Sequence, residues 1–178
     1  MRKRERFLTD FARNGQDEEA SRILCAAVAR LHAHPHQPPS FLVPLTQWFS
    51  DLEACASRSG GIFHLCAQTA RTLLSIQQDL VVSHGDIHYG NVLDFRMQGW
   101  RAIDPKGLWG KRGYDYANLF CNADHSIATG PGRVIRQVDI VSEASDIHRR
   151  RLLQWILAYA GLSAAWAIND KEAALQSL

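Results

Sequence analysis

Apolar residues in the first part of the chain recur every three or four positions, which is the spacing of amphipathic helices. The clearest case covers residues 17–32, where acidic residues fill the first turn and suit the positive end of the helix dipole. The same spacing predicts a second helix over 45–56 and a third over 62–78. A histidine- and proline-rich segment at 34–39 interrupts the pattern and predicts a loop.

The pattern changes at residue 80, where short β-prone runs replace the helical spacing. Residues 80–83 predict a first short strand, and residues 91–95 and 100–103 predict a hairpin around a turn at 97–99. Asp104 follows directly after the second strand of this hairpin. A strand, a loop and a hairpin in succession therefore bring polar residues of this region onto neighbouring backbone ends.

Helical spacing returns after the hairpin. A glycine-rich connection at 107–113 leads into a helix from Tyr114, and a loop at 130–132 precedes a last helix at about 149–168. The chain is therefore predicted to be α+β and mainly helical, with a small β element that carries the polar residues. Its 178 residues are enough to bury a real core, so residues 1–178 are predicted to form a single domain.

Charge and composition narrow the classes of partner. The chain has 20 basic and 18 acidic residues, a balance that argues against nucleic-acid binding. The basic segment at 2–6 is short and contains an acid, so it predicts a solvated terminus. Neither a signal peptide nor an apolar run long enough for a membrane span is expected. These features predict a cytoplasmic protein without a membrane partner.

The four cysteines are far apart and form no Cys-x-x-Cys pair, which argues against a zinc site. Cys25 and Cys66 lie within apolar helical patterns, where a free thiol behaves as a small hydrophobic side chain. Reduced thiols are typical of intracellular proteins.

The segment His-Gly-Asp-Ile-His-Tyr-Gly-Asn at 84–91 contains Asp86 and, five residues on, Asn91, and Asp104 follows thirteen residues later. In phosphoryl transfer one carboxylate orients the attacking hydroxyl, while an amide oxygen and a second carboxylate hold Mg²⁺ on the nucleotide phosphates. The spacing therefore predicts Asp86 as the catalytic residue and Asn91 and Asp104 as Mg²⁺ ligands. A carboxylate at the end of an apolar strand is costly to bury, which also favours a cation beside Asp104.

Three neighbours are expected to support this loop. His84 is expected to orient it by hydrogen bonding, and Asp115 is expected to cap the following helix with a carboxylate that can also pin the loop. The role of His88 stays open, because His84, Asp86 and His88 alternate along the chain in a way that also suits a transition-metal hydrolase. A metal-dependent phosphoester hydrolase is therefore the alternative to a kinase.

Other polar residues near the motif allow more than one interpretation. Lys106 and Lys111 could contact phosphate, although a solvated position suits them equally well. His32, His34 and His36 precede prolines and are expected to be surface residues.

Three segments together resemble the aminoglycoside phosphotransferases: residues 84–91, residues 102–107 and residues 114–118. The similarity is greatest to the streptomycin 6-kinase branch, the aminoglycoside/hydroxyurea resistance kinases, and extends to residues 20–32 and 162–166. The resemblance implies a protein-kinase-like fold and transfer of the ATP γ-phosphate to an antibiotic hydroxyl. It implies that Asp86 matches the catalytic aspartate and that Asn91 and Asp104 match the Mg²⁺ ligands.

The chain departs from the family pattern ahead of the catalytic loop. A kinase-like fold needs a phosphate-covering loop and a strand lysine there, yet the 83 residues before His84 predict helices and contain no Gly-x-Gly-x-x-Gly motif. Pro105 and Lys106 also follow Asp104 in place of the kinase Phe-Gly. We therefore expect a C-terminal lobe whose nucleotide-binding lobe is truncated from the gene or supplied by another chain.

Three hypotheses remain from the sequence: a kinase that is inactive without its first lobe, the metal-dependent hydrolase, and a non-catalytic remnant or binding module. The acceptor cannot be identified from the residues. Several acids could recognise a cationic aminoglycoside and look equally like solvated loop charges: Asp124, Asp139, Glu143 and Asp146.

Overall fold

The computed structural model describes residues 7–33, 40–76, 79–121 and 132–176, with side chains described up to residue 171. Several expectations concern residues outside these ranges: the solvated terminus at 2–6, the loop with His34 and His36, the end of the third helix at 77–78, Asp124, and residues 130 and 131.

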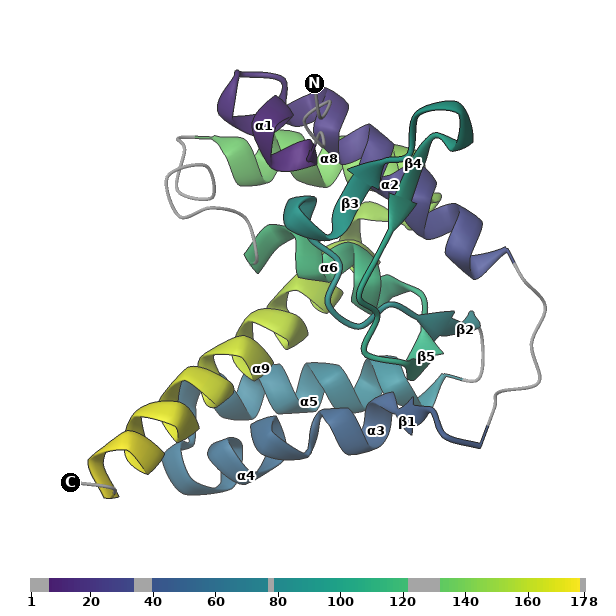
Figure 1. The fold of residues 1–178 in the computed structure, drawn as a ribbon. Helices are drawn as coiled ribbons and strands as arrows, with labels where there is room; N and C mark the ends of the chain where they lie inside the picture. Colours follow the sequence, from purple (N-terminus) through teal and green to yellow (C-terminus); the bar gives the residue numbers. More distant parts are fainter. Residues whose placement is uncertain (1–6, 34–39, 77–78, 122–131, 177–178) are drawn as a thin grey trace.

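One group of helices packs around the predicted first helix, at the upper end of Figure 1: α1 (Leu8–Arg13), α2 (Asp17–His32) and α8 (Arg133–Ser145). The bounds of α2 are those predicted. Neither α1 nor α8 is expected from the sequence pattern. With six residues, α1 is too short to display a helical period. The period of α8 is present in its buried Val138 and Val141, but exposed Val134 and Ile135 obscure it.

A second group of helices occupies the other end of the molecule: α3 (Leu45–Trp48), α4 (Ser50–Ser59), α5 (Gly61–Ser75) and α9 (Arg149–Gln176). The helix α9 runs diagonally through Figure 1 and packs on α5, on α4 and on α6 (Gly113–Cys121). It thereby connects the two groups, since α8 leads into its first turn and also contacts it.

The single helix predicted over 45–56 is divided in the structure into α3 and α4 at Phe49. Hydrogen bonds still cross the division, from Phe49 N to Leu45 O at 3.1 Å and from Glu53 N to Phe49 O at 3.2 Å. The interruption is therefore a local distortion, and the Phe49 ring at this point is buried against Tyr114, with 5.9 Å between the ring centroids.

The helix α9 contradicts the expectation that the chain has no apolar run long enough for a membrane span. Its stretch Arg149–Lys171 is long and apolar enough, by length and composition, to cross a membrane. This composition has a structural cause, because Trp155, Ala158 and Leu162 lie fully buried against the other helices. A core helix of a globular fold satisfies the same test of length and hydrophobicity.

A three-stranded sheet has the order β1–β5–β2, with β1 (Val43–Pro44) parallel and β2 (Leu80–Ser83) antiparallel to the central β5 (Leu108–Lys111). The strand β2 has the predicted bounds. The prediction of a glycine-rich connection at 107–113 was wrong, since this segment contains β5. Gly110 serves close packing there, because a Cβ atom at Gly110 would overlap the Leu45 side chain.

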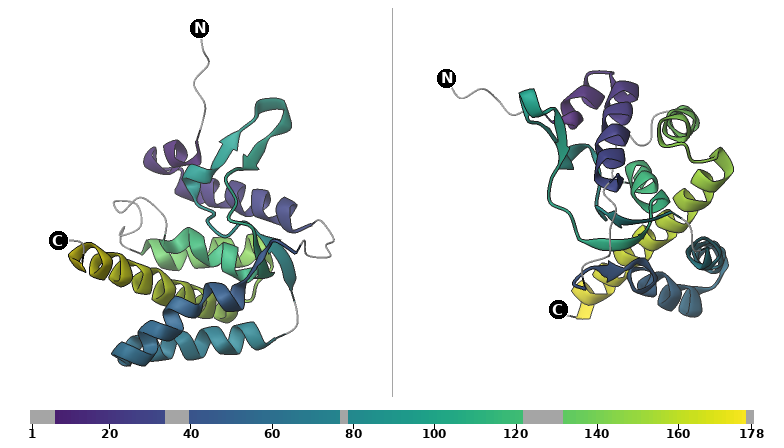
Figure 2. Two further views of the ribbon diagram at one scale, coloured as in Figure 1. Left: turned by 60° about the horizontal axis from the view of Figure 1, so that its bottom comes forward. Right: turned by 90° about the vertical axis from the view of Figure 1, so that its right-hand side faces the viewer.

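The predicted hairpin is present as β3 (Val92–Asp94) and β4 (Trp100–Ala102), joined by a 3₁₀ turn at Arg96–Gln98. It projects from the helices in both views of Figure 2. Leu93 on its edge also forms a bridge to Phe7, just before α1. The hairpin therefore continues directly from the segment at 84–91 and is tied to the first group of helices.

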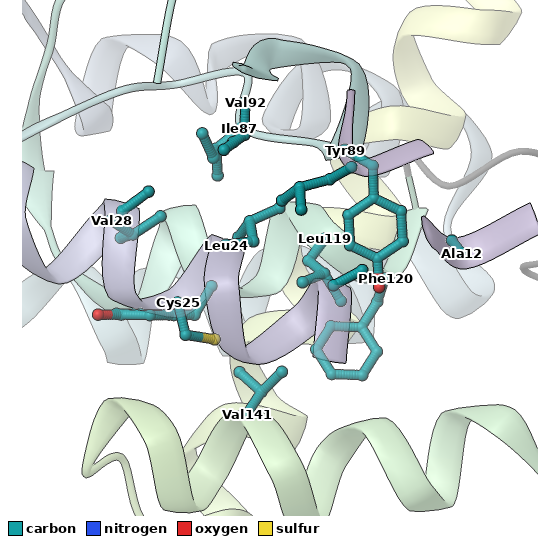
Figure 3. Packing of buried hydrophobic residues seen from close by; sticks show 14 of the residues in the cluster. Ala12, Leu24, Cys25, Val28, Ile87, Tyr89, Val92, Leu119, Phe120 and Val141 are labelled. Atoms are coloured by element: carbon teal, nitrogen blue, oxygen red, sulfur yellow. The ribbon is translucent and has the colours of Figure 1, made fainter. Parts of the chain in front are cut away.

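The buried apolar residues form two clusters. The first core lies between α1, α2, α6 and α8 and includes Ile87, Tyr89 and Val92 (Figure 3). The second core lies between α3, α4, α5, α6, β5 and α9, with Trp155 fully buried. The cysteines expected in the interior are found there: Cys25 in the first core, where burial raises its pKa to about 12, and Cys66 in the second.

Candidate active site

The segment at 84–91 leaves the end of β2 and enters the start of β3, and its side chains divide between two sides. Ile87 and Tyr89 are buried and point into the first core, towards α2 (Figure 3). Asp86, His88 and Asn91 are only partly buried. This alternation fixes the loop from behind with apolar contacts and leaves the polar side chains accessible on the other side. We call residues 84–91 the catalytic loop below, after the role that the sequence analysis predicts for Asp86.

Asp115 of α6 holds the first residues of the catalytic loop. Its Oδ2 accepts a hydrogen bond from His84 N at 2.8 Å, and its Oδ1 accepts one from Gly85 N at 2.9 Å. Gly85 has φ +87°, and a Cβ atom there would lie 2.9 Å from Leu108 Cδ1. Glycine is therefore required both by the left-handed backbone and by the close approach of β5.

His32 is the partner of Asp115 from the opposite side, and its expected position on the surface was wrong. Its Nε2 donates to Asp115 Oδ2 at 2.8 Å, and its side chain is only 7% exposed. The last turn of α2 places the ring edge-on against Tyr116, with 5.8 Å between the ring centroids. The following prolines suggested a solvated histidine, but α2 continues to His32 and covers α6.

His84 is buried and uses both ring nitrogens for the local structure. Its Nε2 donates to Ile103 O at 2.8 Å, because a carbonyl can only accept, and its Nδ1 accepts from Asp86 N at 3.3 Å. The ring thus connects the loop that carries Asp86 to the residue before Asp104. Neither nitrogen has a lone pair left for a metal, so this geometry does not suit the hydrolase alternative.

His88 also has a local partner, since its Nδ1 accepts from Gly90 N at 3.1 Å. Burial is the main reason why the pKa of His88 lies below its usual value, and His84 and Lys106 lower it further while Asp86 opposes them. The ring is therefore neutral near pH 7. Among the residues that the structure describes, no three His, Cys, Asp or Glu side chains form a metal-binding group.

Asn91 and Asp104 lie on two backbone segments that are joined to each other. Asn91 Nδ2 donates to Asp86 O at 2.9 Å, and Ile103 N donates to Asn91 O at 3.0 Å. Asp104 follows with φ +59°, a left-handed conformation that turns the chain out of β4. Asp104 is exposed, so the argument from the cost of burying its carboxylate does not apply to this chain.

The donor set of Asn91 and Asp104 is one amide oxygen and one carboxylate. The hydrogen bond of Asn91 uses its amide nitrogen and leaves the oxygen side of the amide for another partner. Both are hard oxygen ligands of the kind that Mg²⁺ prefers, and Mg²⁺ commonly takes one or two protein ligands and completes its shell with water and phosphate. The residues present therefore fit a magnesium ion.

Lys106 lies beside the Asp86 carboxylate. Its Nζ is 3.5 Å from Asp86 Oδ2, and its backbone N donates to His84 O at 2.7 Å. Lys106 is therefore exposed and lies close to Asp86. Lys111, in contrast, is buried in β5 and is not a solvated residue. Burial lowers the pKa of Lys111, and Arg151 lowers it further.

A buried polar network behind the catalytic loop is absent from the sequence-based predictions. The Tyr89 hydroxyl donates to Asp17 Oδ1 at 2.8 Å and lies 2.6 Å from Ser21 Oγ. Arg133 Nε donates to Asp17 Oδ2 at 2.8 Å, and Gln137 Nε2 donates to the same oxygen at 2.5 Å. The network therefore connects the loop to α2 and α8.

The charge of Asp17 is balanced inside this network. Burial on its own raises the pKa of Asp17, but hydrogen bonds from Arg133, Tyr89 and Gln137 outweigh it and hold the pKa below its usual value. The sequence signal that could have found this network is weak: Arg133 and Gln137 are one helical turn apart on α8, but nothing in the sequence pairs them with Asp17.

Of the described acids considered for antibiotic recognition, two form ion pairs and the third ends a helix. Asp139 pairs with Arg149, and Glu143 pairs with Arg22 at 3.2 Å. Asp146 caps α8 in a left-handed conformation, and its backbone oxygen accepts from Arg112 Nη2 at 2.9 Å. The structure does not bring these acids together into one site.

The order of strand, polar loop, hairpin and buried α6 places the molecule in the class of kinase-like C-terminal lobes. The model of the aminoglycoside/hydroxyurea antibiotic resistance kinase family matches residues 2–171. The chain belongs to this family, and the resemblance inferred from its motifs is confirmed.

Two relatives are similar over different lengths. Streptomycin 3''-kinase of Klebsiella pneumoniae is 46% identical over 168 residues, which are 92% of this chain and 63% of the relative. Streptomycin 6-kinase of Streptomyces griseus is 37% identical over 92 residues, which are 50% of this chain and 30% of the relative. The chain therefore spans less than two thirds of the length of these relatives.

Solved structures support the fold. Aminoglycoside phosphotransferase APH(3'')-Id of Streptomyces rimosus, in complex with ADP and streptomycin, gives a TM-score of 0.60 at 18% identity over 80% of this chain and 61% of that chain. An ethanolamine kinase of Plasmodium vivax gives a TM-score of 0.55 at 13% identity over 93% of this chain and 56% of that chain. The predicted C-terminal lobe of a kinase-like fold is confirmed.

Proposed function

We propose that this chain is the catalytic and acceptor-binding lobe of an ATP- and Mg²⁺-dependent phosphotransferase that acts on a hydroxyl of a streptomycin-like aminoglycoside. The observation that carries the proposal is the connection between Asp86, Asn91 and Asp104. Hydrogen bonds from Asn91 to the backbone at Asp86 and from Ile103 to the backbone at Asn91 hold these residues on adjoining segments.

Each residue has a role in this proposal. Asp86 accepts a hydrogen bond from the acceptor hydroxyl and orients its oxygen towards the γ-phosphate. Asn91 and Asp104 hold the magnesium ion, whose charge offsets the negative charge of the phosphates when it is bound. His84 and Asp115 keep the loop in position through their hydrogen bonds to Asp86 N, His84 N and Gly85 N.

Lys106 has a second role beside Asp86. Its ammonium group lies 3.5 Å from the carboxylate and places a positive charge beside the site of phosphoryl transfer. The ion pair is partly exposed, with the Lys106 side chain 43% accessible. The same ammonium group can therefore turn towards a phosphate oxygen without crossing buried structure.

The nucleotide-binding part of the enzyme is proposed to come from elsewhere. The described residues before the catalytic loop are occupied by α1 to α5 with the short β1 and β2, and these elements build the two cores. Residues 1–178 are therefore proposed to form one domain, a kinase-like C-terminal lobe that works in the cytoplasm with a separate or upstream ATP-binding lobe.

The experiment compares the chain alone with a form to which a nucleotide-binding lobe has been added, called the lobe-restored protein below. The upstream reading frame, or the corresponding region of the Klebsiella pneumoniae streptomycin 3''-kinase, supplies that lobe. ATP-dependent phosphorylation of streptomycin is then measured by mass increase of the antibiotic. We expect phosphorylation by the restored protein and little by the chain alone.

Two results count against the proposal. A restored, folded protein that binds Mg²⁺-ATP but transfers no phosphate to streptomycin would identify a non-catalytic remnant. Hydrolysis of a simple phosphoester that depends on manganese or zinc, in the chain alone, would favour the hydrolase.

A further inference from the structure

A cavity of about 480 Å³ lies where β1, α3 and α4 meet the second half of α9. This volume falls within the range of pockets that bind small molecules. It is lined by one aliphatic residue and by polar and aromatic residues, from segments far apart in the sequence: Val43, Gln47, Trp48, Ser50, Asp51 and Trp166.

The two tryptophans of the cavity are held in fixed orientations. Their rings meet edge to face, with 5.6 Å between the centroids. Trp48 Nε1 donates to the Tyr114 hydroxyl at 2.8 Å, and Trp166 Nε1 donates to Asp51 Oδ2 at 2.9 Å. Because both indole N–H groups are already bonded, a ligand would meet preorganised rings and lose little affinity to their ordering.

The cavity favours positive charge. Asp51 supplies a carboxylate, and none of the ion pairs between described residues includes it. The faces of indole rings attract cations through their quadrupole. Gln47 and Ser50 add polar groups to the same wall. A planar cation that donates hydrogen bonds at its edge and stacks on an aromatic face matches this set of groups, and guanidinium has these properties.

The cavity adjoins the proposed catalytic site through β1. Val43 lines the cavity, and its backbone N donates to Gly107 O at 3.1 Å. Gly107 follows Lys106, whose Nζ is 3.5 Å from Asp86 Oδ2. The cavity wall is therefore connected to the surroundings of Asp86 through β1 and the segment before β5.

We propose that this cavity is a subsite for a guanidinium group of the acceptor, held by Trp48, Trp166 and Asp51. The inference rests on the proposed function for its acceptor and adds the chemical group by which the acceptor is recognised. Streptomycin carries guanidinium groups, whereas many other aminoglycosides carry only amines. The subsite thus selects a guanidinium-bearing acceptor over an amine-bearing one.

Binding to the chain alone tests the subsite without any catalysis. The protein is labelled with ¹⁵N, and the indole N–H signals are followed during titration with streptomycin, methylguanidinium or methylammonium. We expect the signals of Trp48 and Trp166 to shift with streptomycin and methylguanidinium, and less with methylammonium. The signals of Trp100 in the hairpin and of buried Trp155 should stay in place.

A matched pair of variants isolates the carboxylate. Asp51→Asn removes the charge but keeps an oxygen that can accept from Trp166, whereas Glu53→Gln removes a charge from the same helix outside the cavity. We expect Asp51→Asn to weaken streptomycin binding about tenfold, as expected for loss of a hydrogen bond to a charged group, and Glu53→Gln to leave it unchanged.

Other results overturn the subsite. Equal shifts with methylammonium, shifts confined to other tryptophans, or equal affinity in Asp51→Asn would each contradict it. In the lobe-restored protein, Asp51→Asn should raise KM for streptomycin about tenfold with kcat nearly unchanged. Phosphorylation of streptomycin with no response at Trp48 or Trp166 would retain the proposed function and remove only this inference.

Discussion

The two cores of this molecule are built differently, although they have similar numbers of apolar side chains. The first core, behind the catalytic loop, encloses a polar network in which Asp17 is paired with Arg133. The second core, beneath the tryptophan-lined cavity, has aromatic and aliphatic contacts and neutral hydrogen bonds such as that from Trp48 to Tyr114.

This difference matches the part of the molecule that each core supports, which is the catalytic loop for the first core and the cavity wall for the second. An apolar core resists compression but specifies the orientation of a loop weakly, whereas a network of charged hydrogen bonds has few alternative arrangements. Tyr89 brings such a network to within three residues of Asp86. The second core only has to place Trp48 and Trp166 at a cavity wall, and for this tight packing is sufficient.

The largest expected effect comes from breaking the charged pair of the first core. Arg133→Met leaves the partly buried Asp17 carboxylate without its cation, at an expected cost of about 3–5 kcal/mol in the free energy of unfolding. Urea unfolding followed by circular dichroism measures this difference. Arg22→Met is the control, since Arg22 forms an exposed pair with Glu143 that is worth about 0–1 kcal/mol.

In the second core, the corresponding change lowers the stability by overpacking buried side chains. Gly113→Ala places a methyl group where it would overlap the buried Trp155 ring, and overpacking of this kind costs about 1–3 kcal/mol. Gly99→Ala shows the effect of backbone strain without overpacking, because Gly99 has positive φ and an added Cβ atom there would have no atom within 4 Å. A Gly113→Ala protein as stable as the wild type, by the same unfolding measurement, would show that Trp155 is free to move.

A matched pair of tyrosine variants compares the two cores directly. Tyr89→Phe removes a hydrogen bond to an ionised carboxylate, at about 1.5–3 kcal/mol, and Tyr114→Phe removes one from a neutral indole, at about 0.5–1.5 kcal/mol. Thermal unfolding should therefore rank Tyr89→Phe as the less stable variant. The reverse ranking would contradict the assignment of the stronger network to the first core.

The smallest effect is a pH dependence. Since the pKa of Asp17 is lower in the folded chain than in the unfolded one, the unfolded chain binds the additional proton first as pH falls. The stability that Asp17 contributes is therefore fully present above about pH 5 and decreases below about pH 4, near the unfolded pKa of an aspartate. Unfolding free energies between pH 3 and 6, relative to those of Asp17→Asn, measure this slope, which should disappear in the variant.

Local patterns in the sequence predicted much of the fold. The bounds of α2 follow from apolar spacing, those of β2 follow from a short β-prone run, and the hairpin follows from two such runs around a turn. The split at Phe49 and the strand β5 could not be predicted in this way, because both depend on tertiary contacts, with Tyr114 and with Leu45.

The candidate site likewise contains residues that the sequence predicts and residues that it does not. Asp86, Asn91 and Asp104 are recognisable by type and spacing within one stretch of chain, and their functional roles stay predictions. His32 and the Asp17–Arg133 pair were missed because their partners lie 83 and 116 residues away. Long-range pairings leave no periodic signal in a single sequence, so only the folded structure reveals how the catalytic loop is held.

The central claim is that Asp86 is the catalytic residue of a phosphotransferase site of which this chain provides one lobe. The most direct test is kcat for ATP-dependent phosphorylation of streptomycin by the lobe-restored protein and its Asp86→Asn variant. The substitution keeps the backbone oxygen to which Asn91 donates. We predict a decrease in kcat of about 10²–10⁴-fold with an unchanged unfolding midpoint. An Asp86→Asn protein that transfers phosphate at the wild-type rate would contradict the account.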